Sequence, residues 1–452
     1  RQSFDYVSED LRLSSLEDTE LLIGDMASHE VTVEEAPLVV AALPDSAPRN
    51  HTRDVHILSS AFLLVFLAFG AVQNLETTLN SDEGLGTISL GILYVSFMIC
   101  SVFASPVVRY LGPRKALIWG TSGYWLFIAA NMLPIWYTMV PASIFLGFAA
   151  SIIWVGQGTY LTSSGRSHAR ENCLHEGAVI GQFNGEFWAM FATHQFLGNL
   201  FSLAILRDGT DGNTKGANLL YFVFLCIMTL GSFLMCFLRE KEANREETSS
   251  SDAPSLKSIS KSVVTPLLDR KLQMIIPLLA YSGLQQAYVW AEYTKDIVKP
   301  SLGESGVGGA MAVYGAFDAI CSIIAGRLTS GTTSIAWITS FGCLLHLLAL
   351  AWILLSQSVY PIVIGVLLGI GDGVLNTQIY ALLALLFKHD TEGAFAQLKL
   401  WQSASIAAVF FVTPHISLET MTLAMLLVLL IAVAAFYYLI SRVEKPVSSQ
   451  KL

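Results

Sequence analysis

Long apolar stretches recur along residues 53–442, and short polar connections separate them. Each stretch is long enough to cross about 30 Å of hydrocarbon as an α-helix, which takes about 20 residues. The pattern therefore predicts an all-α membrane protein with twelve transmembrane helices. We expect these helices near residues 55–73, 87–104, 115–133, 138–163, 177–206, 218–238, 272–292, 306–327, 333–355, 360–387, 391–412 and 417–441.

Polar segments divide the chain into five expected parts. Residues 1–52 are acidic and poor in aromatic residues, which is typical of a disordered tail. A six-helix bundle over 53–238 and a second one over 272–442 flank the hydrophilic run 239–271, which we interpret as a flexible cytosolic linker. Residues 443–452 form a second cytosolic tail.

Internal similarity indicates that the two bundles are repeats. Three short segments of the first half match segments of the second half in the same order and at nearly constant spacing. Six plus six helices in parallel repeats is the architecture of the major facilitator superfamily. The matched segments are 67–73 with 279–285, 146–148 with 368–370, and 175–178 with 391–394.

The distribution of Lys and Arg predicts the orientation of the chain. The even-numbered connections and the C-terminal tail together carry seventeen basic residues, whereas the odd-numbered connections carry four. Because basic residues accumulate on the cytoplasmic side, we expect both termini to be cytosolic.

Composition supports a membrane location. Only 13% of the 452 residues are charged and 53% are hydrophobic, whereas soluble domains carry about 25% charged residues. The net charge of −9 comes mostly from residues 1–50, which hold eleven acidic and three basic residues. No basic patch indicates nucleic acid as a partner. No nucleophile–base pair, phosphate loop or metal-ligand spacing indicates an enzyme, a cofactor or a metal site.

Ionisable residues inside the predicted spans are the strongest functional signal. Asp372 lies twelve residues after Tyr360, roughly 18 Å along a helix and so near the middle of the bilayer. Asn376 follows one turn later on the same face and could share a ligand. Intramembrane acids pair, face a water-filled cavity or handle an ion. We therefore expect Asp372 to sense a cation or a proton, with a structural Asp in a glycine-rich packing patch as the alternative.

Three further ionisable residues accompany Asp372 within spans: Glu186, Asp318 and Lys399. The excess of acids favours a cation or proton over an anion. As the single base among them, Lys399 is expected to pair with one of the acids. Gln182 lies one turn before Glu186, and the recurring glycines around them predict close helix packing.

Two related polar faces complete the set of candidate binding residues. Tyr281 and Gln285 lie one turn apart in the seventh span, and Phe69 and Gln73 repeat this spacing in the first. The faces suit a central cavity shared by both halves or, alternatively, hydrogen bonds between helices. His194 and His346 are interpreted as hydrogen-bonded core residues.

Four short motifs occur together in this chain: Asn74-Leu75-Glu76-Thr77-Thr78, Leu90-Gly91-Ile92-Leu93-Tyr94, Ile153-Trp154-Val155-Gly156-Gln157-Gly158 with Tyr160, and Gly369-Ile370-Gly371-Asp372. As a set they resemble the Unc-93 family, most closely its plant-type members, over roughly residues 53–442. The resemblance implies a facilitator-type fold and a role in potassium-channel regulation and ion homeostasis or, in other members, in receptor trafficking. The segment 107–115 departs from ordinary facilitators, because Val108 replaces an acid that helps to lock one state.

Two functions are consistent with these observations. The first is a transporter or cation-handling permease in potassium homeostasis, and the second is a non-transporting regulatory subunit or trafficking chaperone of an ion channel or receptor. Glu17, Leu21 and Leu22 fit an acidic dileucine sorting motif, which indicates an endomembrane (vacuolar or endosomal), with the plasma membrane as the alternative. A continuous polar cavity that reaches Asp372, Asp318 and Glu186 would favour the permease.

Overall fold

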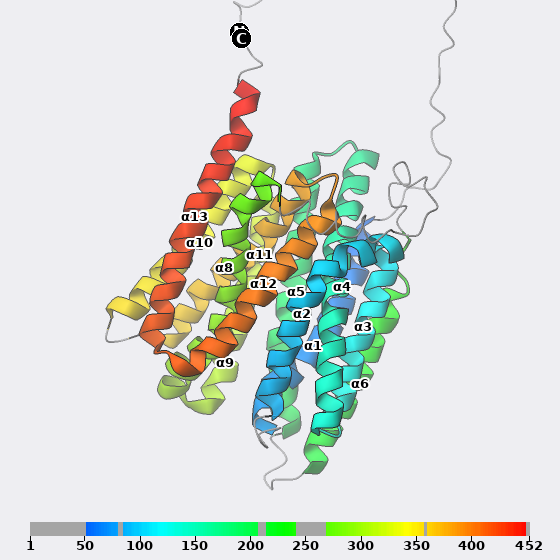
Figure 1. Ribbon diagram of the computed structural model, residues 1–452, viewed down its shortest axis with the longest axis vertical. Helices are drawn as coiled ribbons and strands as arrows, with labels where there is room; N and C mark the ends of the chain where they lie inside the picture. Colours follow the sequence, from blue (N-terminus) through cyan, green and yellow to red (C-terminus); the bar gives the residue numbers. More distant parts are fainter. Residues whose placement is uncertain (1–50, 80–84, 207–213, 241–267, 357–358, 449–452) are drawn as a thin grey trace, which may run out of the picture. The chain divides into compact units, whose positions relative to one another are not determined.

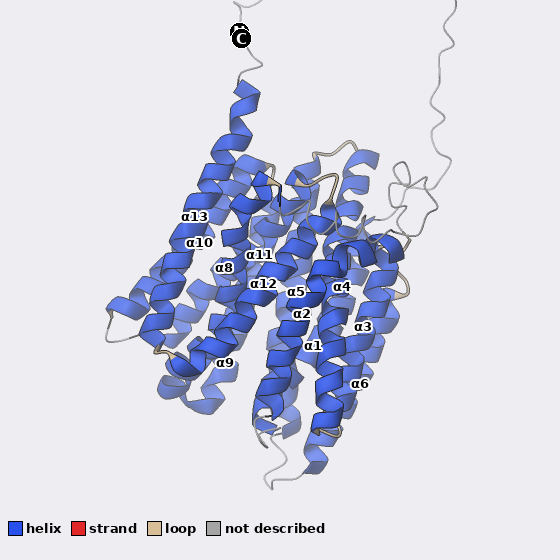
Figure 2. Ribbon diagram, viewed as in Figure 1, coloured by secondary structure: helices blue, strands red, loops and turns tan. Residues whose placement is uncertain are grey.

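The computed structural model describes residues 51–79, 85–206, 214–240, 268–356 and 359–448. Within these ranges the chain forms helices joined by turns and contains no strand (Figure 2). The expectation of an all-α fold is confirmed for this part of the chain.

Helices follow one another along the described parts of the chain (Figure 1). The view in Figure 1 shows α1 to α6 on the right and α8 to α13 on the left. The first group comprises α1 (His51–Leu79), α2 (Leu85–Leu111), α3 (Pro113–Ala130), α4 (Trp136–Glu171), α5 (Glu176–Leu206) and α6 (Thr214–Met235). The second group comprises α8 (Arg270–Tyr288), the π-helix η3 (Val289–Val298), α9 (Lys299–Leu328), α10 (Thr332–Leu355), α11 (Pro361–Leu386), α12 (Thr391–Val412), the short 3-10 helix η4 (Thr413–His415) and α13 (Leu418–Ser448).

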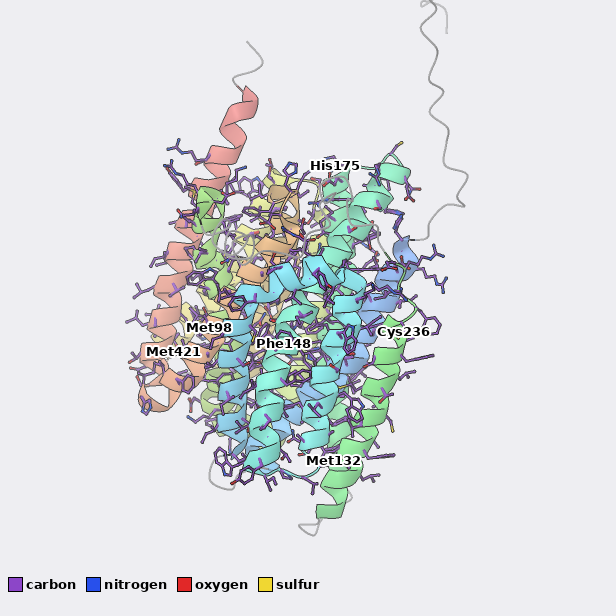
Figure 3. All side chains as sticks on the ribbon, turned by 45° about the vertical axis from the view of Figure 1, so that its right-hand side comes forward. Met98, Met132, Phe148, His175, Cys236 and Met421 are labelled. Carbon is purple, nitrogen blue, oxygen red and sulfur yellow. The ribbon has the colours of Figure 1, made fainter. Side chains whose placement is uncertain are left out.

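Eight helices of the described ranges are long and apolar enough to cross a membrane, and they make the chain an integral multi-pass protein. They are α1, α2, α4, α9, α10, α11, α12 and α13. The four other predicted spans coincide with α3, α5, α6 and α8. Figure 3 shows His175, between α4 and α5, and Met132, between α3 and α4, at opposite ends of the helices.

The boundaries of the helices follow local signals in the sequence. Gly112 has a φ of +78°, which glycine adopts without strain, and Pro113 then begins α3 with its φ already fixed. The carboxylate of Asp390 accepts a hydrogen bond from the backbone N–H of Gly393 at 3.0 Å and so caps the start of α12.

The connection between the seventh and eighth predicted spans differs from the expectation. Residues 293–305 separate these two predicted spans in the sequence, but η3 and the start of α9 continue the helix through them. The direction changes only at Gly303, whose φ is +74°. The Tyr293 hydroxyl donates to the Pro361 carbonyl oxygen at 2.9 Å and fastens η3 to α11. Side-chain polarity alone does not end a helix whose backbone groups stay paired.

Glycines allow α5 to approach α9 closely. Gly177, Gly181 and Gly185 of α5 face residues of α9 and the turn after it. A Cβ atom on Gly326 of α9 would lie 2.6 Å from the Gly181 carbonyl oxygen, far closer than packed atoms tolerate. The predicted small-residue stripe is therefore confirmed as a packing surface.

Candidate functional site

A cavity of about 110 Å³ lies in the interior of the helical assembly. Its walls come from α1, α2, α3, α4 and α5 on one side, and from α8, η3, α9, α11 and α12 on the other. This volume is room for several water molecules or a small ligand. Five of the predicted site residues line it: Gln73, Asp318, Asp372, Asn376 and Lys399.

Asp372 is held by donors from its own and a neighbouring helix. The carboxylate accepts hydrogen bonds from the Tyr314 hydroxyl of α9 and from the Asn376 side-chain amide, the latter at 2.8 Å. Gln286 of α8 in turn donates to the Asn376 side-chain oxygen at 3.3 Å. Asp372 and Asn376 therefore act as one unit, as their one-turn spacing predicts.

Asp318 lies next to this unit, one turn after Tyr314 on α9. Its carboxylate accepts a hydrogen bond from Ser322 at 3.2 Å, and Ser322 also donates to the Gly373 carbonyl oxygen at 3.3 Å. The side chain of Asp318 is 7% exposed, and that of Asp372 is 6% exposed. Two buried carboxylates thus line the same wall of the cavity, where α9 meets α11.

Lys399 lies in the cavity wall without the acidic partner that we expected. Its ammonium donates to the Gln402 side-chain oxygen at 2.8 Å and lies 4.2 Å from the centroid of the Trp154 ring. No ion pair of Lys399 occurs within the described ranges. The expectation of a pairing with an acid is therefore wrong for these residues. A cation–π contact and an amide provide part of the stabilisation that a carboxylate would give.

Aromatic side chains make up much of the remaining wall, and the sequence interpretation did not assign them to the site. Trp154 stacks on Trp188 with ring centroids 5.9 Å apart, and Phe66 contacts Trp154 at 5.0 Å. Tyr94 accepts a hydrogen bond from Gln73 at 3.0 Å. The signal that could have found them is the presence of Trp and Tyr deep within spans rather than at the membrane interface, where they are usually enriched.

Tyr281 and Gln285 do not line the cavity, although both are buried. The Tyr281 hydroxyl and the His346 Nδ1 atom are 3.0 Å apart, and the His346 Nε2 atom lies 3.2 Å from the Leu368 carbonyl oxygen. His346 is thus a hydrogen-bonded core residue, as expected. His194 also has a hydrogen bond, to the Phe191 carbonyl oxygen, but it lines the cavity as well.

Glu186 and Gln182 also lie outside the cavity lining. They bond each other, with the Gln182 amide donating to the Glu186 carboxylate at 2.8 Å. The cavity thus reaches Asp372 and Asp318 but not Glu186, so the condition that would favour the permease is met in part.

The glycines around Asp372 serve helix packing rather than access to a ligand. A Cβ on Gly369 would collide with the backbone of Tyr314, and one on Gly371 would collide with the His346 ring. A Cβ on Gly373 would lie 2.8 Å from the Asp318 carboxylate. The glycine patch therefore brings α9 and α10 against α11 and sets the position of both carboxylates.

Charged residues join the two groups of helices at the end that carries His175. Arg109 at the end of α2 contacts Asp390 at 2.8 Å and Glu392 at 3.7 Å. Glu176 of α5 contacts Lys388 at 2.7 Å. Although Val108 replaces an acid in this segment, ion pairs still connect the two groups here. The motif of Glu17, Leu21 and Leu22 lies outside the described residues.

Several known proteins are similar in sequence to this chain. Residues 78–360 and 353–437 match the family described as "Ion channel regulatory protein UNC-93". UNC93-like protein 3 of Arabidopsis thaliana is 60% identical over 408 residues, which cover 87% of this chain and 88% of that protein. A Caenorhabditis elegans protein named for potassium channel regulation, unc-93, is 30% identical over 436 residues, which cover 86% of this chain and 61% of that one.

The fold also matches a solved transporter structure. The major facilitator superfamily transporter FucP, in its outward conformation, superimposes with a TM-score of 0.67 at 11% identity, covering 86% of this chain and 99% of that chain. At this identity the likeness concerns the fold alone. Together, the matched family and the helical architecture show that this chain belongs to the UNC-93 family and has a major-facilitator-type fold.

Proposed function

We propose that this UNC-93 family protein is a permease that handles a cation or proton in its central cavity and contributes to ion (potassium) homeostasis. The observation that carries the proposal is the cavity, because it exposes the buried carboxylates of Asp372 and Asp318 to a potential ligand. A dry, fully paired core would have no such site. Intramembrane acids that line a cavity mark ion and proton pathways in transporters.

The architecture that goes with this proposal has twelve spans in two six-helix repeats. α1 to α6 would form the bundle of residues 53–238, and α8 to α13 the bundle of 272–442, joined by the cytosolic linker 239–271. Two packing relations support the repeat: α2 packs along α12, and α5 packs along α9. In each pair the second helix of one half meets the fifth helix of the other, as a two-fold axis between the halves requires.

A regulatory role is the second candidate, and the family description favours it. In this case the chain would be a non-transporting subunit or trafficking chaperone that binds an ion channel or receptor. The C. elegans relative is named for potassium channel regulation. Binding of a channel partner and transport of a solute through the cavity would be separate properties. Channel current and solute flux must therefore be measured independently.

Flux measured on the purified full chain in liposomes tests the permease. We expect uptake of K⁺, Na⁺ or protons above that of empty liposomes, and at least a ten-fold loss of this flux in Asp372→Asn. Glu186→Gln is the matched control, since it removes a membrane carboxylate outside the cavity lining and should retain the flux. Absence of flux in the wild-type chain, with a change in the current of a co-expressed potassium channel, would favour the regulator instead.

We also propose that an acidic dileucine motif determines the membrane in which the protein resides. Glu17, Leu21 and Leu22 would direct it to a vacuolar or endosomal membrane. Replacement of both leucines by alanine should then move a fluorescent fusion to the plasma membrane. An unchanged distribution would mean that the motif is incidental.

A further inference from the structure

Opposite charges line the cavity without meeting each other. Asp318 and Asp372 lie on the wall formed by α9 and α11, and Lys399 of α12 lies on another part of the lining. Lys399 forms no ion pair within the described part of the chain. A buried charge normally has a counter-charge close by, because burial removes the water that would otherwise stabilise it.

The ammonium of Lys399 has hydrogen-bonding capacity to spare. It carries three donors, of which one goes to Gln402 at 2.8 Å. The Trp154 ring, 4.2 Å away, covers one side but accepts no conventional hydrogen bond. Gln402 itself is fixed, since its amide donates to Ser282 at 2.9 Å. Lys399 is therefore held in place, with donors free for an anionic group that enters the cavity.

The two carboxylates have the complementary property. Within the described residues, the donors to Asp372 and Asp318 are neutral hydroxyl and amide groups, among them those of Tyr314, Asn376 and Ser322. Such donors orient a carboxylate but do not compensate its charge. An ammonium group from a ligand would both compensate the charge and add hydrogen bonds that are stronger than neutral ones.

We propose that the cavity binds a small zwitterion, with its ammonium at Asp372 and Asp318 and its carboxylate at Lys399 and Gln402. This inference rests on the proposed function, since the same carboxylates would hold the cation or proton, and it adds a zwitterion to the ligands that the cavity takes. A cation or a simple amine alone would leave Lys399 without a counter-charge. A simple anion would leave both carboxylates without one.

The aromatic side chains of the cavity lining suit an apolar body. Phe66, Tyr124 and Trp188 line the cavity together with Trp154. Aromatic side chains offer a large apolar contact area and pair well with other aromatic groups. An α-amino acid with an apolar side chain combines these three requirements in a small volume.

Binding to the purified full chain in lipid nanodiscs tests the inference. The probes are L-alanine, L-leucine and L-phenylalanine, each with its amide, which keeps only the ammonium, and its N-acetyl derivative, which keeps only the carboxylate. We expect at least one of the three amino acids to raise the melting temperature and to bind at least ten-fold more tightly than both of its derivatives.

Two variants assign the ends of the ligand. Lys399→Met should weaken binding of the amino acid at least ten-fold and remove its advantage over the amide. Asp372→Asn should remove its advantage over the N-acetyl derivative. Glu186→Gln should bind all probes as the wild type does. A variant is folded if, without ligand, it melts at the same temperature as the wild type.

Two results would overturn the inference. Binding of no amino acid would do so, and so would binding of the amides at least as tightly as the amino acids. Cation flux in liposomes that persists in either case would leave the proposed permease standing, whereas absence of both flux and binding would remove that as well.

Discussion

At the scale of single residues, the carboxylate of Asp372 is stabilised by neutral donors rather than by a buried cation. Tyr314 and Asn376 occupy its oxygens, while Lys399 bonds Gln402 and lies over Trp154. No ion pair joins the two charges in the described part of the chain, so replacing one should not leave the other newly unpaired. This separation distinguishes a functional carboxylate from one that only neutralises a lysine.

Asp372→Asn should consequently cost less than about 1 kcal/mol in stability, because asparagine is nearly isosteric and still exchanges hydrogen bonds with Tyr314 and Asn376. Lys399→Met should not rescue any loss. Tyr314→Phe should cost more, about 1–3 kcal/mol, since it leaves a buried carboxylate oxygen without its donor. Thermal unfolding of the purified variants measures this order. A loss of about 3–5 kcal/mol in Asp372→Asn, with rescue by Lys399→Met, would instead indicate a hidden ion pair.

At the scale of elements, the glycine contacts between α5 and α9 fix how the two groups of helices meet. Gly326 has backbone atoms of Gly181 and Gly185 where a side chain would be, whereas nothing lies within 4 Å of a Cβ on Gly308 of the same helix. Backbone atoms cannot move aside as a flexible side chain can. The same substitution should therefore have opposite effects at these two positions.

Gly326→Ala should destabilise the protein by about 1–3 kcal/mol through overpacking. Gly308→Ala should be neutral or stabilising by up to about 1 kcal/mol, because alanine favours a helix over glycine. The difference in melting temperature between the two variants is the measurement. Equal melting temperatures would mean that α5 and α9 are not in close contact.

At the start of α12, Asp390 both caps the helix and contacts Arg109. Asp390→Asn keeps the capping oxygen and removes the charge, so it should cost no more than about 1 kcal/mol, as exposed ion pairs do. Asp390→Ala also loses the cap and should cost about 1 kcal/mol more. Unfolding of both variants at low and high salt checks this, since only the ion-pair contribution should fall with salt.

At the scale of the whole molecule, charge distribution and helix order combine into a definite topology. The Lys and Arg bias predicts that both termini and the connection 239–271 face the cytosol, and that the connection 207–217 faces the opposite side. The ion pairs of Arg109, Glu176 and Lys388 would then join the two groups of helices on the cytosolic side.

Epitope tags test this topology in intact cells and after selective permeabilisation. A tag within residues 207–213 should be accessible from the side opposite to one at the C-terminus. A tag within 241–267 should behave like the C-terminal one and serves as the control. Cytosolic exposure of the 207–213 tag would contradict the predicted orientation.

The sequence by itself determined the helical membrane architecture, since hydrophobic runs and their polar interruptions depend only on the cost of burying polar groups in lipid. It also identified the membrane carboxylates Asp372 and Asp318, because a charge within an apolar run stands out wherever it lies. Tertiary structure decided the rest. Which candidates share one cavity depends on how helices pack, and this places Gln73, Asp372 and Lys399 in its wall but Glu186 and Tyr281 outside it. The ammonium of Lys399 lies over two aromatic rings, those of Trp154 and Tyr380. Trp154 is more than two hundred residues away along the chain and Tyr380 is about twenty residues away, so no local pattern reveals these contacts. Side-chain contacts between distant helices arise only when close packing brings the helices together.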